Sequence, residues 1–443
     1  MGQRGVTGTR AERVVGCAAR SFLFLQGPAS PFFSQLGAAL LARGHRVHRV
    51  NLHGGDQLFW KLPGAVNYRG RDRRWPAFLE ALLIARGITD LVLFGDCRPR
   101  HQAAVRVAQA LRLPVHVFEE GYIRPHWVTL DSGGANGNSN LPRDPDWHRE
   151  QALRLPPEFT PEFAGGEDVP SSFARRAADD LAYNFGYMLL GWSFPFSRTH
   201  RPWHPLTEYA GWGTRLLRRR LRRAAIAAEV AQAGRLLDFY VFPLQLDCDF
   251  QVRRHSPFGR MMPAIEAVLA SFAAYAPAEV SLLVKEHPLD NGLRNWRRRI
   301  GAVADQLGIA GRLRYIEDGD LSRLTRAARG MVTINSTSGT LALAAGVPVV
   351  ALGQAVYAMP GLTFQGGLDR FWTEAQPPDP ALFAAFRRVL AHTCLVRGGF
   401  YSTKGLDMLA ENAAARLEAR PPGQASLRGR AAYETGAVPV AVG

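Results

Sequence analysis

The feature that most constrains the fold is a repeated order of apolar run, polar turn and helical stretch. A strand is expected at Ser21–Leu25, and a helix at Phe32–Arg43 leads to a second strand at Arg46–Leu52. Strands at Asp90–Phe94 and Val115–Phe118 continue this order. It returns later in apolar runs at Phe239–Leu244, Val280–Val284, Leu313–Ile316, Met331–Ile334 and Val349–Leu352. Because such alternation builds parallel sheets with right-handed crossovers, we predict an α/β protein with two doubly wound, Rossmann-type domains.

Shifts in composition divide the chain around these two repeats. Residues 1–19 form an Arg-rich stretch that we expect to be a flexible basic arm, and residues 421–443 form a Pro-, Gly- and Ala-rich stretch that we expect to be a flexible tail. Between them we predict an N-terminal Rossmann-like domain (20–150), a helical connecting region with aromatic and basic segments (151–237), a C-terminal Rossmann-like domain (238–395) and a C-terminal helix (396–420).

Bulk composition excludes several classes of protein. With 443 residues, 47% of them hydrophobic and 21% charged, the chain is globular and long enough for two cores. The four cysteines are widely spaced, which excludes a disulfide framework and a zinc finger. No apolar run approaches the roughly 20 residues of a membrane span, and no signal sequence is evident, so we expect a cytoplasmic protein. The net charge of +16 favours anionic partners, but no nucleic-acid reading motif is present.

Two turns at strand ends have the composition of a phosphate site. Met331–Ile334 runs into a small polar turn before a helix, which consists of Asn335, Ser336, Thr337 and Ser338. Free backbone N–H groups, hydroxyls and a helix N-terminus favour an anion there. Lys285, His287 and Pro288 follow the neighbouring strand and would lie at the same sheet edge. We predict that both turns hold the phosphate of a nucleotide-activated sugar; the alternatives are an ordinary capped turn and a structural histidine.

Carboxylates gather at other strand ends. Glu119 and Glu120 follow one strand of the first repeat, whereas Asp247 and Asp249 follow a strand of the second. A further acidic pair, Glu317 and Asp318, ends Leu313–Ile316. Ligands of open α/β sheets bind beyond the carboxyl ends of the strands, so two such sheets would face a shared cleft. This is the GT-B-like arrangement of two-domain glycosyltransferases.

Five segments together resemble a known family: QGPASPFF, FEEGYIRPHWVTL, FPLQLDCDFQV, KEHPLDNG and INSTSGTLALAAGVPVVALG. In this order, from roughly Ser21 to Phe400, the chain is similar to capsule polysaccharide biosynthesis and export proteins of the KpsS type. The resemblance implies a retaining β-Kdo transferase that uses CMP-Kdo, the cytidine-activated form of an acidic sugar. The implied acceptor is a (lyso)phosphatidylglycerol terminus, where the first Kdo starts the lipid linker of an exported capsule. Other capsule biosynthesis and export proteins are the implied partners, with no metal or other cofactor.

The resemblance also implies roles for single residues. His287-Pro288 and the Ser336-Thr337 or Thr337-Ser338 pair look like the elements that hold the cytidine nucleotide in related enzymes. Retention of configuration requires a carboxylate opposite the nucleotide, and we choose Asp249 as this nucleophile, with Asp247 in reserve. Glu119 or Glu120 would deprotonate the acceptor hydroxyl.

Each of these carboxylates has another interpretation. Glu119 and Glu120 are also expected from ion pairing with Arg124. Asp247 and Asp249 match the metal-binding DxD motif of single-domain transferases, which belongs to a different architecture. Glu317 and Asp318 either bind ribose hydroxyls or the cytosine edge, or form a turn.

The connecting region and the overall function leave further alternatives. The basic run Arg215–Ala225, beside the aromatic segment Tyr183–Trp203, is typical of a helix on an anionic inner-membrane surface. A solvated helix face, with the aromatics packed between domains, is the other interpretation. Rival functions are a transferase using another donor, such as CDP-glycerol with polyol phosphate, and a non-catalytic subunit of the capsule exporter.

Overall fold

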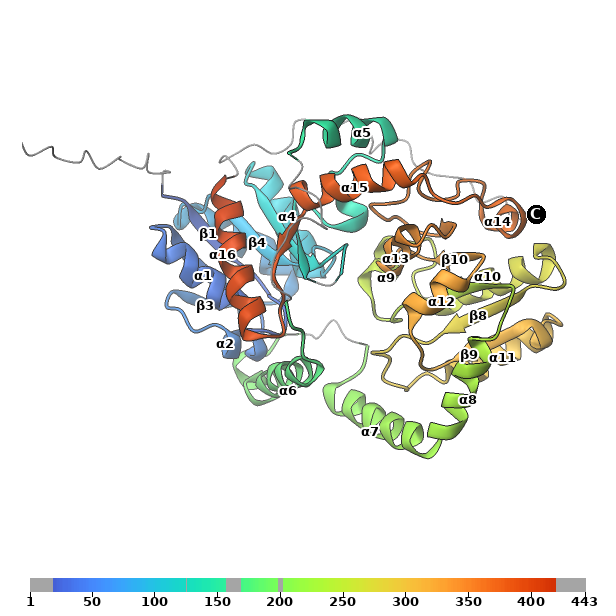
Figure 1. The fold of residues 1–443 in the computed structure, drawn as a ribbon. Helices are drawn as coiled ribbons and strands as arrows, with labels where there is room; N and C mark the ends of the chain where they lie inside the picture. The colour runs from blue at the N-terminus through green and yellow to red at the C-terminus, as the bar shows by residue number, and fades with distance from the viewer. Residues whose placement is uncertain (1–18, 125, 157–168, 198–201, 420–443) are drawn as a thin grey trace, which may run out of the picture.

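The computed structural model describes residues 19–124, 126–156, 169–197 and 202–419. Residues 1–18 of the expected arm and the whole of the expected tail lie outside them. Two sheets organise the described chain (Figure 1), and we refer to each sheet with its helices as a lobe. The predicted GT-B-like α/β class is confirmed, because each lobe is built on a mainly parallel sheet and strand ends of the two sheets meet.

The first sheet has seven strands in the order β12-β6-β5-β4-β1-β2-β3. Their bounds are β1 Ser21–Phe24, β2 Arg46–Asn51, β3 Ala65–Asn67, β4 Asp90–Phe94, β5 Val115–Glu120, β6 Trp127–Ser132 and β12 Leu395–Arg397. The pairs among β1 to β5 are parallel, whereas β6 is antiparallel to both β5 and β12. The four expected strands of this sheet are confirmed. Strands β3, β6 and β12 were not predicted, because β3 and β12 are only three residues long and β6 mixes apolar with polar residues.

The second sheet has five parallel strands in the order β11-β10-β7-β8-β9. They are β7 Phe239–Pro243, β8 Ser281–Lys285, β9 Leu313–Ile316, β10 Gly330–Thr333 and β11 Val349–Ala351. All five were predicted within one or two residues at each end.

Helices cover both faces of each sheet. Successive residues of β1 point to opposite faces, so Phe22 packs on one side with α1 (Phe32–Ala42) and Leu23 on the other. That other face is covered by α3 (Trp75–Ala85) and α4 (Pro99–Ala110). In the second lobe, one face is covered by α10 Met261–Tyr275, α11 Trp296–Gln306 and α14 Leu368–Glu374. The opposite face is covered by α8 Arg223–Ala233, α12 Leu321–Ala327, α13 Ser338–Ala344 and α15 Pro380–Thr393.

The C-terminal segment returns to the first lobe. After α15, the chain adds β12 to the edge of the first sheet and continues into α16 (Thr403–Ala419). In Figure 1 the red α16 lies beside the blue α1. The helix expected at 396–420 therefore begins only at Thr403. The first two residues of the expected helix are instead the end of β12, which belongs to the sheet of the first lobe.

The connecting region is divided between the lobes. Residues 151–237 contain the last residues of α5 (Pro145–Arg154), together with α6 (Phe173–Leu189), α7 (Pro205–Leu221) and α8. Helix α6 packs on α2 (Gly54–Phe59) of the first lobe, and a Cβ on Gly54 would lie 2.1 Å from the carbonyl oxygen of Gly186. This close approach requires glycine. Within the described ranges, no helix is both long enough and apolar enough to cross a membrane.

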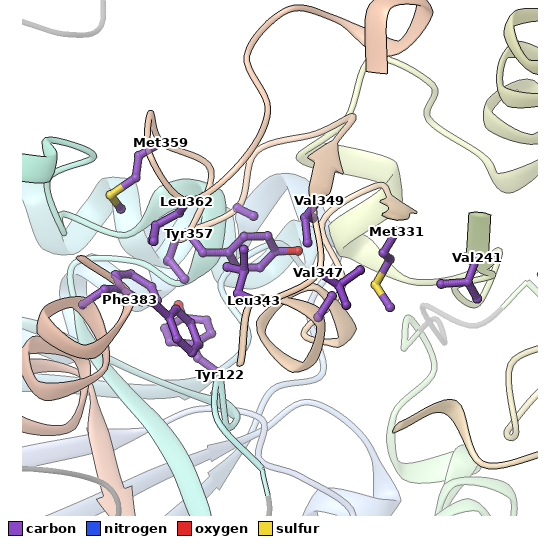
Figure 2. Packing of buried hydrophobic residues seen from close by; sticks show 14 of the residues in the cluster. Tyr122, Val241, Met331, Leu343, Val347, Val349, Tyr357, Met359, Leu362 and Phe383 are labelled. Atoms are coloured by element: carbon purple, nitrogen blue, oxygen red, sulfur yellow. The ribbon is translucent and has the colours of Figure 1, made fainter. Parts of the chain in front are cut away.

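The lobes are joined by a shared apolar cluster. Tyr122, just beyond β5, is buried among second-lobe side chains that include Tyr357 and Phe383 (Figure 2). The Thr340 hydroxyl of α13 donates a hydrogen bond to the Tyr122 carbonyl over 3.1 Å. Carboxyl ends of strands in both sheets are thereby brought together.

Candidate functional site

The turn after β8 presents a neutral histidine with one free donor. His287 Nδ1 accepts a hydrogen bond of 3.0 Å from the Leu289 N–H. A neutral ring with Nδ1 as acceptor carries its proton on Nε2. No hydrogen-bond partner for Nε2 occurs among the described residues, so this N–H is available to a ligand.

Positive charges converge on this histidine. Burial, followed by the charges of Lys285, Arg124, Arg176 and Arg215, lowers the pKa of His287 to about 4. These cations come from β8, the loop after β5, α6 and α7. Cations that disfavour a protonated imidazole favour an anion at the same place. The turn is therefore a candidate anion site.

Arg215 holds this turn in place from α7. Its buried guanidinium donates to the carbonyl oxygens of Pro288, over 3.0 Å, and of Asp290, and pairs with Glu286 over 2.9 Å. This inward role of Arg215 differs from the surface basic run predicted at Arg215–Ala225. The signal that could have found it is helical spacing, because Glu208, Gly211 and Arg215 lie three and four residues apart and all are buried.

Asn335 supports the hydroxyl turn from within. It is buried and paired with Gln245 in both directions, over 3.0 and 3.2 Å. Its Nδ2 also donates to the Gln251 carbonyl over 2.8 Å. These bonds occupy the Asn335 side chain, so it fixes the start of the turn rather than reaching outward.

The three hydroxyls of this turn differ in availability. Ser336 Oγ accepts the Ser338 N–H over 3.1 Å, and this bond shapes the turn. Ser338 Oγ is buried without a partner in the described chain, and Thr337 makes no side-chain capping bond to α13. Neither of the two pairs left open by the sequence is singled out by these contacts, because Ser336 Oγ keeps a proton to donate and Ser338 Oγ is buried.

The charge of Asp249 in the second lobe acts on Glu119 in the first lobe. Burial raises the pKa of Glu119, at the end of β5, to about 8, and the charge of Asp249 is the next largest cause. Asp249 lies at the start of α9 (Phe250–Arg254), where its side chain accepts the Gln251 N–H over 2.9 Å. Burial also raises the pKa of Asp249. A carboxyl whose pKa is raised by burial and by a nearby charge is typical of acid–base sites.

The neighbouring carboxylates are occupied by arginines. Glu120 pairs with Arg124 over 3.7 Å and with Arg176 over 3.5 Å. Asp247 pairs with Arg294 over 2.7 Å and accepts the N–H of Met261 at the start of α10. Glu120 therefore forms the ion pairs that were the alternative to catalysis. Asp247 has a structural role, because it contacts the start of α10 and Arg294.

Glu317 and Asp318 anchor α7 and α8 to the second lobe. Buried Glu317 pairs with Arg222 over 3.1 Å and with Arg218 over 3.6 Å, and Asp318 pairs with Arg219. These contacts enclose the Glu317 carboxylate, whereas the Asp318 side chain remains 56% exposed. A separate cavity of about 970 Å³ lies between α8 and α12, and Asp318 is the one expected site residue in its lining.

A second polar contact joins the lobes. Cys97 Sγ lies 3.0 Å from His255 Nε2 and 3.3 Å from Asp96 Oδ1. Within the described ranges these three buried residues form the one group whose potential metal-ligand atoms lie within 4.8 Å of one another. Asp247 and Asp249 belong to no such group. The sequence analysis missed this trio because its members come from different lobes.

Fold and site together define a two-lobed α/β protein of the GT-B-like class, with a candidate anion site and candidate catalytic carboxylates where strand ends meet. The family model described as capsule polysaccharide biosynthesis protein matches residues 89–401, and the chain belongs to this family. The predicted resemblance is therefore confirmed.

Similar proteins extend over most of the chain. The capsule polysaccharide export protein KpsS of Escherichia coli is 34% identical over 388 residues, which cover 86% of this chain and 97% of that protein. The capsule polysaccharide modification protein LipB of Neisseria meningitidis serogroup B is 34% identical over 391 residues, covering 87% and 92%. Among solved structures, Thermosulfurimonas dismutans KpsC, a beta Kdo 2,7 transferase, matches with 14% identity, a TM-score of 0.43 and coverage of 90% and 99%.

Proposed function

We propose that this protein is a retaining β-Kdo glycosyltransferase that moves Kdo from CMP-Kdo to a (lyso)phosphatidylglycerol terminus and so starts the lipid linker of a capsule. Membership of the capsule biosynthesis family supports the pathway. The observation that carries the proposal is the free Nε2–H of His287, set among four cations. A nucleotide phosphate is an anion that fits it.

The donor end of the reaction uses the second lobe. His287 Nε2–H and hydroxyls of the 336–338 turn donate to the phosphate of CMP. The bond from the anomeric carbon to the phosphate oxygen breaks, and CMP leaves as an anion that the surrounding cations stabilise. Such a leaving group needs neither a proton nor a metal.

Asp249 and Glu119 carry out the remaining steps of the proposed reaction. Asp249 attacks the anomeric carbon as CMP leaves, and the resulting ester no longer carries the negative charge. Because that charge is one cause of the raised pKa of Glu119, ester formation lowers this pKa and Glu119 releases its proton to solvent. The acceptor hydroxyl then gives its proton to Glu119 and bonds to the anomeric carbon, and the bond to Asp249 breaks.

The proposed acceptor is a membrane lipid, and it therefore suggests where in the cell the protein acts. We propose that the protein acts at the cytoplasmic face of the inner membrane, as a peripheral protein, beside other capsule biosynthesis and export proteins. No nucleic-acid partner and no further cofactor belong to this scheme.

The test is incubation of the full chain with CMP-Kdo and a fluorescent lysophosphatidylglycerol, followed by mass analysis of the lipid. We expect the mass of one added Kdo, lost in His287→Ala and Asp249→Ala and retained in Asp247→Asn. CDP-glycerol in place of CMP-Kdo should give no product. An unchanged lipid mass with a donor shown to be intact would overturn the proposal and favour a non-catalytic role.

A further inference from the structure

Helix α6 exposes a stripe of large apolar side chains. Leu181, Phe185 and Leu189 are four residues apart, and all are exposed by half or more of their area. Trp192, in the short helix that follows, is 80% exposed. The aromatic segment is therefore only partly packed inside, since Tyr183 and Phe194 are buried while this stripe faces outward.

Helix α7 carries a matching stripe. Leu206, Leu217 and Leu221 fall within a narrow arc at about 100° per residue, and Leu221 is 77% exposed. Arg220 lies about 40° beyond the Leu206 edge of this arc at the same 100° per residue, and it is exposed. An outward face of leucines and arginine on one helix has the amphipathic pattern of an interfacial helix.

The arginines of the basic run, from α7 to the start of α8, point in different directions. Arg218 and Arg219 turn inward to Glu317 and Asp318. Arg220 and Arg223 are exposed, and neither has an acidic partner in the described part of the chain. The outward remainder of the run is thus positive and complementary to an anionic surface.

The two helices lie along one edge of the molecule (Figure 1). Tyr209 of α7 donates a hydrogen bond to the Asp180 carbonyl of α6 over 3.4 Å, which joins them. Both also reach the candidate site, because Arg176 of α6 pairs with Glu120 and Arg215 of α7 holds the His287 turn. A lipid brought to this edge would lie beside both lobes.

We propose that this docking face, formed by Phe185, Leu189, Trp192, Leu217, Arg220 and Leu221, binds the surface of an anionic phospholipid bilayer. The leucine and aromatic side chains enter the headgroup and acyl boundary, and the outward arginines attract anionic headgroups. That the bilayer supplies the acceptor rests on the proposed function. Membrane docking itself does not, because it needs neither donor nor chemistry.

The test is co-sedimentation of the full chain with vesicles of phosphatidylcholine alone, or of equal parts phosphatidylcholine and phosphatidylglycerol. Two exposed arginines lead us to expect about tenfold or greater preference for the anionic vesicles, decreasing as salt is added. Trp192→Glu and the double variant Leu217→Glu/Leu221→Glu should lose most of this binding, and Arg220→Ala should lose part of the preference for phosphatidylglycerol.

Leu153→Glu is the matched control. Leu153 is 85% exposed on α5, at the opposite edge of the molecule in Figure 1, so this variant should bind vesicles like the unaltered protein. All variants should unfold at the same urea concentration as the unaltered protein, which shows that they are folded. Equal vesicle binding by Trp192→Glu and Leu153→Glu, or no binding by the unaltered chain, would overturn the proposal. So would dissociation of a dimer by Trp192→Glu without loss of vesicle binding, because a second copy would then cover the face.

The two proposals fail separately. Transfer to a soluble short-chain lysolipid without vesicle binding would leave the transferase intact and remove the docking face. Vesicle binding without transfer would do the reverse.

Discussion

At the scale of single residues, neighbouring side chains of one type have different environments. Glu119 and Glu120 are adjacent on β5 and so point to opposite faces of the strand. Glu120 pairs with two arginines, while Glu119 is opposed by Asp249. The sequence alone identified both glutamates as candidates but could not assign them different roles. The charges that distinguish them come from α6 and from the second lobe.

Glu119→Gln should reduce kcat/KM by about 10²- to 10⁴-fold, the usual contribution of a general base. Because the proposed ester removes the Asp249 charge and so lowers the pKa of Glu119 from about 8, the rate of transfer should rise with pH and level off below pH 8. A pH profile of transfer checks both. Glu120→Gln is the control. A larger loss of kcat/KM in Glu120→Gln than in Glu119→Gln would show that Glu120, and not Glu119, is the general base.

The same pKa has a consequence for stability. A carboxyl whose folded pKa is raised from 4.5 to about 8 stabilises the fold fully below pH 4.5, and this contribution is lost as pH rises through 8. Urea unfolding at pH 5 and pH 9 should show a fall in the free energy of unfolding that is smaller in Glu119→Gln. An equal fall in both proteins would contradict the raised pKa.

His287→Ala should weaken CMP binding by about tenfold to 100-fold, as expected for one hydrogen bond to a charged group. His287→Gln, which keeps an N–H donor, should weaken it less. Because the pKa of His287 in the empty protein is about 4, the ring is neutral above that pH and its contribution should not change between pH 5 and pH 9. Calorimetric titration with CMP measures each case, and unchanged affinity in His287→Ala would remove this residue from the site.

At the scale of elements, α7 is an internal brace as well as an outward face. Its arginines at 215, 218 and 219 are fixed by carbonyls and carboxylates of the second lobe. Only the direction of each side chain around the helix distinguishes them from Arg220.

Arg215→Met should lower the free energy of unfolding by about 3–5 kcal/mol, because it leaves the Glu286 carboxylate buried beside unpaired carbonyls. Arg220→Met, the same substitution in the same helix, should change it by about 0.5 kcal/mol or less. Urea unfolding followed by fluorescence measures both. Equal effects would show that Arg215 does not brace the His287 turn.

At the scale of the whole molecule, the last described helix, α16, packs into the core of the first lobe. Leu409 of α16 is fully buried in the core that contains Phe22 of β1 and Leu36 of α1. The first lobe therefore cannot be completed until the second has been traversed by the chain.

Leu409→Ala should cost about 2–5 kcal/mol, the range for large-to-small substitutions in a core. Glu411→Ala, two residues along the same helix, removes an exposed partner of Arg43 and should cost about 1 kcal/mol or less. Urea unfolding compares them. If the two costs were alike, α16 would not be part of the first lobe's core.

Periodicity along the chain was enough to predict both sheets, nine of their twelve strands and the placement of His287 and the hydroxyl turn at strand ends. These features depend on residues a few positions apart, where the side-chain pattern itself reports the backbone. Tertiary structure alone decided the rest. The separation of Glu119 from Glu120, the inward turn of Arg215, the contact of Cys97 with His255 and the return of β12 all join residues distant in the chain. The physical reason is that burial and charge at each of these groups are set by packing between elements, which no local pattern contains.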